Sequence, residues 1–299
     1  MEYYDWMIKY TPQKEWIERR GILLWLAFFF IELGAGMFFV SSFFQSVPGM
    51  LAGWIVCGVL GGGLHLLFLG KPLRFWRIVF SSGWQTSWIS RGLIFVSLFL
   101  LLGMAHLGLS LSSGPTVPLL IASDILAFLT VIYGGFAMNY VNGIPLWNTA
   151  LLPVLYVTSG LWGGAEVTLG MSLSRGDISL GISIEVWIRI LLLGFILLVG
   201  IYLISVRYSS QAGRASVRQI LSERWSSLFW GIVVILGIIV PLVAVVNSFG
   251  FGLALTPKAL IYAAISCGLL GDLTMRYLIL RCGMYSPLIY SGRPTIPAQ

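Results

Sequence analysis

Charged residues are scarce in this sequence. Asp, Glu, Lys and Arg make up 10% of the 299 residues, whereas 58% are hydrophobic and the mean hydropathy is +0.92. Soluble proteins carry about 25% charged and about 45–50% apolar residues, so a soluble globular domain is excluded. Apolar runs of about 18 residues or more recur along the chain, and each is long enough to cross a bilayer. These runs are continuous rather than alternating, which also excludes a membrane β-barrel.

The apolar runs predict an all-α integral membrane protein with eight transmembrane helices in two packed four-helix bundles. The predicted spans are 21–43, 51–69, 91–111, 119–139, 147–170, 185–206, 226–249 and 259–280. An amphipathic leader (1–20) precedes this domain (21–280), and a tail (281–299) follows it. No cleavable signal peptide is expected, since the first run is long enough to span.

An even number of spans places both termini on one face, here named side A, opposite side B. Fifteen of the 18 basic residues fall on side A, and only Arg175, Arg189 and Lys258 fall on side B. Because cytoplasmic loops are enriched in Lys and Arg, side A is expected to be cytoplasmic.

Histidine and cysteine are also scarce, which excludes common redox cofactors. The two histidines, His65 and His106, are expected near opposite faces, about 20 Å apart at 1.5 Å of rise per residue. They cannot both ligate one haem iron. An iron–sulfur cluster needs about four thiolates, whereas this chain has Cys57, Cys267 and Cys282 and no CxxC pair. No lysine lies within a span, which excludes a retinal Schiff base.

Ionisable residues inside spans are costly and mark candidate functional positions. They are Glu32, His65, His106, Asp124, Glu166, Arg189, Asp272 and Arg276. Near side A, His65 is joined by Tyr133 and by the basic residues Lys71 and Arg74. A quinone fits such a pattern, because its carbonyls need hydrogen-bond donors and its reduction needs protons, and imidazole exchanges protons near neutral pH.

Structural interpretations of the same residues remain open. A single buried histidine near a helix end is commonly a structural hydrogen-bonding group, and the basic run from Lys71 to Arg77 is typical of an interfacial anchor. Asp272 and Arg276 are spaced i, i+4 and are expected to pair with each other. Glu32 lies beside Gly34 and Gly36, which favours a tight helix contact.

Several motifs resemble the NrfD-like family, the membrane subunits of polysulfide reductase and related complexes, which include membrane anchors of the DMSO reductase type. The matching segments are ELGAG (32–36), LHLLFLGKPLRFWR (64–77), SWISRG (87–92), YGGF (133–136) and PLWNTALLPVLYVTSGLWGG (145–164). The second and third segments together are rather specific. The last helix, with Gly271 and Arg276, fits the family pattern more loosely.

The resemblance implies a quinone-reactive anchor subunit of a respiratory oxidoreductase in a bacterial or archaeal cytoplasmic membrane. Such a subunit binds menaquinone or a similar quinone and carries no haem or cluster of its own. It exchanges electrons with a ferredoxin-like iron–sulfur subunit, which connects to a molybdopterin catalytic subunit, and no nucleic acid is expected among its partners. Polysulfide reductase docks these subunits on the outer face, whereas the charge rule makes side A cytoplasmic.

By motif, the quinone contacts fall on His65 and Tyr133, and Lys71 and Arg74 would stabilise negative charge on the reduced ring or fix the connection. The family's polar residues early in the first helix are replaced by Leu24 and Ala27. The candidate proton-path groups are Glu32, Asp124, Glu166 and Asp272.

Two other functions remain open from the sequence. The first is a cation-coupled secondary transporter, in which the carboxylates of the spans bind a cation, although no internal repeat is evident. The second is a structural anchor that recruits a complex without touching quinone. Co-purification of an iron–sulfur protein and of menaquinone distinguishes these hypotheses from quinone chemistry.

Overall fold

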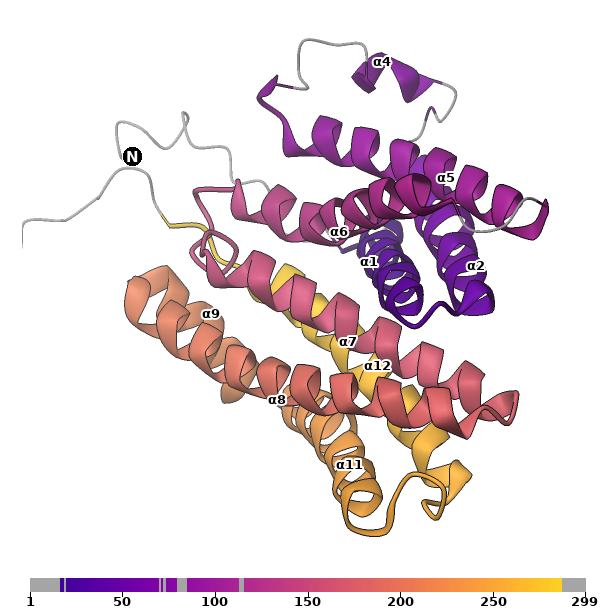
Figure 1. Cartoon of the computed structure of the whole chain (residues 1–299). Helices are drawn as coiled ribbons and strands as arrows, with labels where there is room; N and C mark the ends of the chain where they lie inside the picture. The colour runs from indigo at the N-terminus through magenta and orange to yellow at the C-terminus, as the bar shows by residue number, and fades with distance from the viewer. Residues whose placement is uncertain are drawn as a thin grey trace, which may run out of the picture.

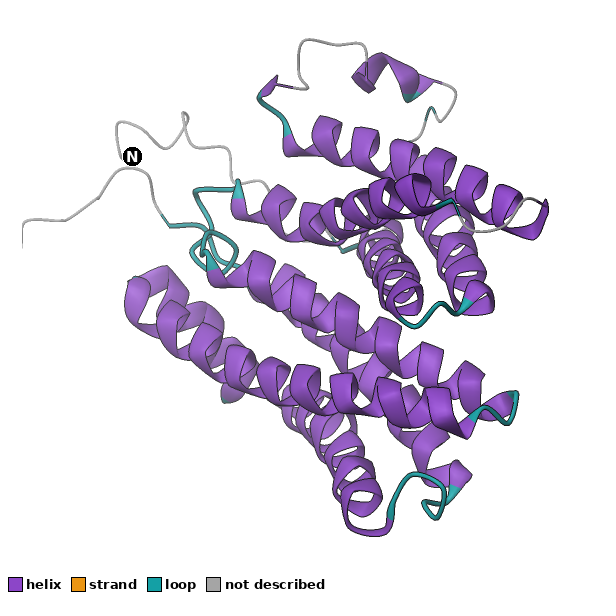
Figure 2. Ribbon diagram, in the orientation of Figure 1, coloured by secondary structure: helices purple, strands orange, loops and turns teal. Residues whose placement is uncertain are grey.

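A computed structural model of the chain describes residues 17–18, 20–69, 71, 74–79, 85–112 and 116–286. Throughout these residues the regular structure is helical (Figure 2). Most of the predicted leader and tail lies outside the described residues, which include 17–18 and 20 of the leader and 281–286 of the tail. Seven helical stretches are long and apolar enough to cross a membrane, so the chain is a multi-pass membrane protein.

The first half of the structure consists of four long helical stretches. They are α1 (Gly21–Phe43), the continuous stretch α2 (Val47–Ile55), η2 (Val56–Gly62) and α3 (Gly63–Phe68), then α5 (Trp88–Ser112) and α6 (Val117–Asn139). The short helix α4 (Trp76–Val79) lies in the connection before α5. Figure 1 shows this group in its upper half, in indigo to magenta.

The second half contains α7 (Leu151–Ser174), α8 (Ile178–Ser209), α9 (Gln211–Leu221), a continuous stretch of α10 (Ser226–Leu228), η5 (Phe229–Ile239) and α11 (Val240–Phe251), and finally α12 (Lys258–Cys282). Helix α7 is the eighth long helix. It is less hydrophobic than a typical span because it is packed centrally and carries buried small and polar residues. The prediction of eight spans therefore matches the number of long helical stretches, of which seven meet the criteria for a span.

Two predicted boundaries change in ways that matter for the site. Helix α8 begins at Ile178 rather than at 185, because the side chain of Asp177 accepts a hydrogen bond from the backbone N–H of Leu180 and caps the helix. At 32 residues it is about 48 Å long, which exceeds the hydrocarbon core of about 30 Å. The charged connection predicted over 207–225 contains the amphipathic helix α9, whose buried face includes Val217 and Ile220.

Glycine contacts hold the two halves together. Helix α1 packs against α7 where a β-carbon on Gly36 would overlap the backbone of Gly160. Small residues of this kind let transmembrane helices approach closely. The indole N–H of Trp25 on α1 also donates to the carbonyl of Leu273 on α12 at 3.0 Å.

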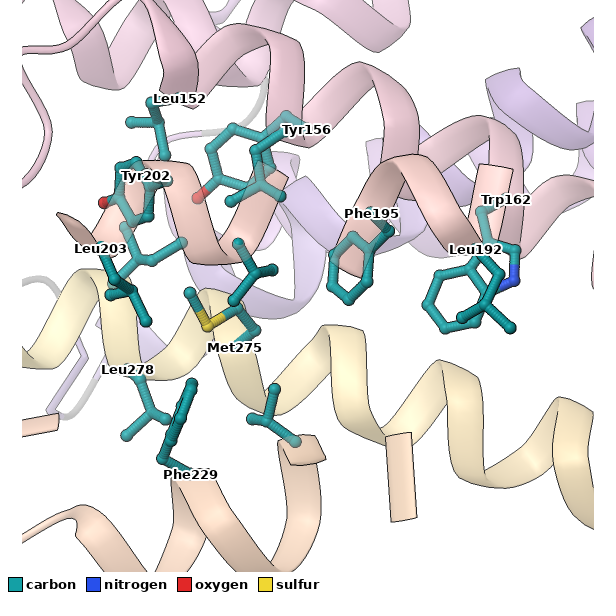
Figure 3. Close-up of a cluster of buried hydrophobic side chains, with 14 of the residues drawn as sticks. Leu152, Tyr156, Trp162, Leu192, Phe195, Tyr202, Leu203, Phe229, Met275 and Leu278 are labelled. Atoms are coloured by element: carbon teal, nitrogen blue, oxygen red, sulfur yellow. The ribbon is translucent and has the colours of Figure 1, made fainter. Parts of the chain in front are cut away.

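The core of the second half is formed by large side chains from four helices (Figure 3). Trp162 on α7 lies against Phe195 on α8 with ring centroids 5.0 Å apart, and the Tyr202 hydroxyl donates to the carbonyl of Leu146 at 2.5 Å. The indole N–H of Trp147 donates to the carbonyl of Ile279 on α12 at 2.7 Å. The large side chains of this half therefore pack closely together in one core.

Candidate functional site

An apolar cavity of about 250 Å³ lies in the first half, between the α2–η2–α3 stretch, α5 and α6. Its lining consists of Ile31, Gly58, Gly62, His65, Leu66, Leu69, Phe75, Ile89, Gly92, Leu93, Val96, Ser97, Leu100 and Tyr133. Leu66, Leu69 and Ile89 are also exposed on the outer surface of the helices. Because that surface faces lipid in a membrane protein, the cavity opens toward the bilayer.

The cavity brings together two residues singled out from the sequence. The Tyr133 hydroxyl lies 3.4 Å from Nε2 of His65, at the long end of the hydrogen-bonding range. Nδ1 of His65 is buried and makes no hydrogen bond of ordinary geometry within the described part of the chain. The pair therefore retains hydrogen-bonding capacity that the protein itself does not fully use.

Phe28 on α1 forms the wall behind this pair. Its ring meets the His65 ring edge to face, with centroids 5.4 Å apart and planes at 84°, and lies 5.8 Å from the Tyr133 ring. Leu24 packs in the same cluster. At this end of the cavity α1 thus presents apolar side chains, which agrees with the departure from the family pattern seen at Leu24 and Ala27.

Glycines give the cavity its shape. Gly58 and Gly62 lie in the π-helical segment η2, and π-helical turns are frequent at functional sites. On α5, the Tyr133 ring occupies the space that a β-carbon on Gly92 would need. The glycine of the SWISRG segment therefore fixes how closely α6 and its tyrosine approach α5.

The basic residues predicted for the site lie at its edge. Lys71 and Arg74 are exposed, and neither lines the cavity, although their neighbour Phe75 does. They sit on the connection that follows α3. At that position they lie at the side A edge of the cavity and not next to the His65 imidazole.

A buried ion cluster joins the two halves a short distance from the cavity. The Arg276 guanidinium on α12 forms ion pairs with Glu32 on α1 and with Asp272, the latter at 3.0 Å, and donates to the Ser159 hydroxyl at 2.6 Å. It also lies over the Tyr156 ring, 4.4 Å from the centroid. The predicted Asp272–Arg276 pair is confirmed, and Glu32 belongs to the same cluster.

Glu32 also reaches toward the cavity. Its carboxyl occupies the space beside Gly134, the residue that follows Tyr133 on α6. One of its oxygens, Oε1, is buried and unpaired among the described residues. Glu32 thus lies between the ion cluster and the helix turn that carries Tyr133.

The other predicted carboxylates lie apart from the cavity. Glu166 is 2% exposed in the second half, and Oε2 has no hydrogen-bond partner in the described part of the chain. Asp124 on α6 is half-buried between the exposed residues Ile121 and Ile125, and its Oδ1 is buried and has no hydrogen-bond partner among the described residues.

The second histidine lies at the far end of α5. His106 Nδ1 is 3.0 Å from the Thr116 hydroxyl, next to the start of α6, whereas His65 lies at the other end of that helix pair. Among the described residues, no group of three or more His, Cys, Asp and Glu side chains is placed to hold a metal ion.

Sequence reasoning missed two residues of importance. Phe28 was hidden within an unbroken apolar run. Glu185 was placed at the start of a span, but it lies two turns inside α8, is 4% exposed and pairs with Arg189 at 2.7 Å. The capping residue Asp177 is the signal that reveals the earlier helix start.

Comparison with known proteins matches most of this chain to a family model. The family model described as polysulphide reductase, NrfD, matches residues 19–287. The chain belongs to the NrfD family. A curated relative, the "Protein NrfD homolog" of Haemophilus influenzae, is 28% identical over 167 residues. That alignment covers 53% of this chain and 50% of the relative, so the chain spans about half the length of the curated relative it matches.

Proposed function

We propose that this NrfD-family protein is the quinone-reactive membrane subunit of a respiratory oxidoreductase. In this role the His65–Tyr133 cavity binds a menaquinone-type head group, and electrons pass to or from an iron–sulfur subunit docked at side A. The single observation that carries the proposal is an apolar, lipid-facing cavity with one imidazole and one phenol at its inner wall.

The residues of the cavity fit such a ligand. A head group with two ring carbonyls needs hydrogen-bond donors within an otherwise apolar slot, and ligand sites commonly have this composition. His65 and Tyr133 supply the donors, while Leu66, Leu93 and Leu100 supply apolar walls. The lipid-facing opening beside Leu69 and Ile89 gives an isoprenoid tail a route to the bilayer.

Each residue has a definite task in this proposal. When bound, a quinone carries two electrons and two protons between its oxidised and reduced forms. The Tyr133 hydroxyl donates to one ring oxygen, and the His65 imidazole holds or releases a proton at Nδ1. Phe28 keeps the His65 ring in place and excludes water from the wall behind it.

In this proposal, charged groups around the cavity carry protons and attract the redox partner. Glu32, whose carboxyl borders Gly134, is the nearest member of the proposed proton path, and Asp272 continues it through Arg276. Side A carries exposed basic residues at two places, Lys71 and Arg74 on the connection after α3 and Arg214 and Arg218 on α9. Such a surface favours an acidic redox partner, here a ferredoxin-like subunit that connects to a molybdopterin catalytic subunit.

The test uses the complex purified with its partner subunits from membranes that contain menaquinone. Bound menaquinone is extracted and quantified, and electron transfer from a short-tailed menaquinol is followed. We expect His65→Ala to abolish quinol-linked turnover while the complex still assembles. Tyr133→Phe removes one hydrogen bond of about 0.5–1.5 kcal/mol, so quinone affinity should fall about three- to tenfold.

Two variants serve as controls. His106→Ala removes the histidine that contacts Thr116 at the opposite end, and Tyr262→Phe removes an exposed tyrosine hydroxyl. Both should keep quinone content and turnover. Unchanged turnover in His65→Ala would contradict the proposal, and intact partner subunits without any bound menaquinone in the parent complex would indicate a structural anchor instead.

A further inference from the structure

A second, smaller cavity lies in the other half of the molecule, toward side B. It has a volume of about 30 Å³, which is enough to hold a water molecule, and is lined by residues of α7, α8, α11 and α12. Most of its lining is apolar, including Ile188, Ala244 and Ile261. The polar residues at its wall are Glu166, Glu185 and Ser248.

Glu166 is the unusual member of this wall. Its side chain is 2% exposed, its Oε2 has no hydrogen-bond partner among the described residues, and its carboxyl fills the space beside Gly268 on α12. The charged group that faces it from α12 is Asp272, which repels it. Asp272 itself pairs with Arg276, and among the described residues Glu166 forms no ion pair with a guanidinium group.

Glu185 provides the second carboxyl group from α8. It pairs with Arg189 at 2.7 Å and accepts a hydrogen bond from the Ser248 hydroxyl on α11. Arg189 lies over the ring of Phe249, 5.2 Å from its centroid. Glu185 is therefore a fixed, charged oxygen donor at the cavity wall.

The charges around this cavity do not balance. Among the described residues, Arg189 pairs with Glu185 and Arg276 pairs with Glu32 and Asp272, whereas Glu166 forms no ion pair. An uncompensated ion in a membrane interior costs several kcal/mol, which favours uptake of a positive charge. The free oxygen of Glu166 at a water-sized cavity identifies the place where that charge is accepted.

We propose that Glu166, Glu185 and Ser248 form a site for one small monovalent cation, either a proton bound to the Glu166 carboxyl group or Na⁺. Ser248 and Glu185 both lie within a few turns of the side B ends of their helices, so the cation enters from side B. This site goes beyond the proposed quinone chemistry and does not depend on it.

The test uses the full chain in nanodiscs of uncharged lipid, dialysed against choline chloride and freed of quinone. Infrared difference spectra report the carbonyl band of a protonated carboxyl group at neutral pH. We expect this band in the parent protein and its loss in Glu166→Gln. Glu223→Gln, which removes an exposed carboxyl paired with Arg218 on side A, should leave the band unchanged.

Addition of NaCl distinguishes the two cations. If Na⁺ is the occupant, NaCl removes the band and raises the thermal midpoint of the parent protein but not of Glu166→Gln. If the proton is the occupant, NaCl and choline chloride give the same band. Ser248→Ala keeps both carboxyl groups and should shift the carbonyl band without removing it. This variant tests the site if Glu166→Gln fails to fold. A parent protein without the band in sodium-free buffer, or a band that persists in Glu166→Gln, would overturn the proposal.

Discussion

Arg276 on α12 forms a buried ion pair with Glu32 on α1, and this pair connects the two halves of the molecule across their interface. The side chains of both residues are almost completely buried, at 3% and 0% exposure. The Arg276 guanidinium also donates hydrogen bonds to the Asp272 carboxyl group and the Ser159 hydroxyl. Removal of Arg276 alone leaves two buried carboxylates without compensation, whereas removal of Glu32 as well leaves one, Asp272.

We therefore expect Arg276→Gln to destabilise the protein by about 3–5 kcal/mol, which is typical of a broken buried ion pair. The double variant Glu32→Gln/Arg276→Gln should recover part of that loss, since one buried carboxylate has been removed with the guanidinium. Thermal or denaturant unfolding in detergent measures both. Arg218→Gln, which breaks the exposed pair with Glu223, should change stability by less than about 1 kcal/mol. Equal stability of the Arg276 and Arg218 variants would show that the buried cluster contributes little.

Gly92 is predicted to be essential for the geometry of the cavity. In Gly92→Ala the added methyl group overlaps the Tyr133 ring, so the ring must move away from α5 and from His65. We expect a loss of about 1–3 kcal/mol in stability together with reduced menaquinone content. Gly63→Ala is the matched control, because a β-carbon there meets nothing within 4 Å. If both variants retain the same quinone content, the position of Tyr133 is not decisive for binding.

Gly268 should be equally intolerant of a side chain, for a different reason. A β-carbon at this position overlaps the carboxyl group of Glu166, which then has to leave the wall of the small cavity. Gly268→Ala is expected to lower the thermal midpoint and to weaken the protonated-carboxyl band. Gly200→Ala on α8 adds a methyl group in open space and should leave both unchanged or slightly raise the midpoint. A Gly268→Ala variant that matches the parent in both measurements would contradict this arrangement.

The start of α8 predicts a pH dependence. Hydrogen bonds from the Leu180 N–H and the Ser179 hydroxyl hold the pKa of the Asp177 carboxyl below its usual value. A lowered pKa means that the folded state favours the charged form, so this contribution is complete above the ordinary pKa of about 3.9 and is lost as the pH falls through the folded value. Asp177→Ala should lower the thermal midpoint at neutral pH, and the difference from the parent should shrink in acid. Asp177→Asn, which can still cap the helix, should retain most of the stability.

The sequence predicted the long helices well because hydrophobic length is a direct requirement of the bilayer. It also predicted that Asp272 and Arg276 pair, since residues four apart share a helix face. It did not reveal the partner of that pair on α1, because a contact between Glu32 and Arg276 depends on how helices far apart in the chain pack together. Helix α9 was missed for a related reason, since its apolar residues are few and are buried only against other helices.

The residues of the candidate site could likewise be predicted only in part from the sequence. The motifs brought His65 and Tyr133 together correctly, and the structure places them 3.4 Å apart. Proximity to side A suggested that Lys71 and Arg74 join them, but both are exposed on the connection. Asp124 was grouped with the interior carboxylates by depth, and the structure shows it half-buried, with one buried carboxyl oxygen, away from the cavity. Glu185 was missed because a boundary placed seven residues too late turned an interior position into a helix end.

The lipid-facing mouth beside Leu66, Leu69 and Ile89 changes how affinity must be measured. A ligand that arrives by lateral diffusion within the bilayer has already left water, so its hydrocarbon chain gains almost no transfer free energy on entering the protein. Selectivity then depends on the polar ring, and dissociation constants are meaningful as mole fractions of membrane lipid rather than as aqueous concentrations. Chain-length variants of one ring should accordingly differ in how they partition into the bilayer and not in how tightly they are held.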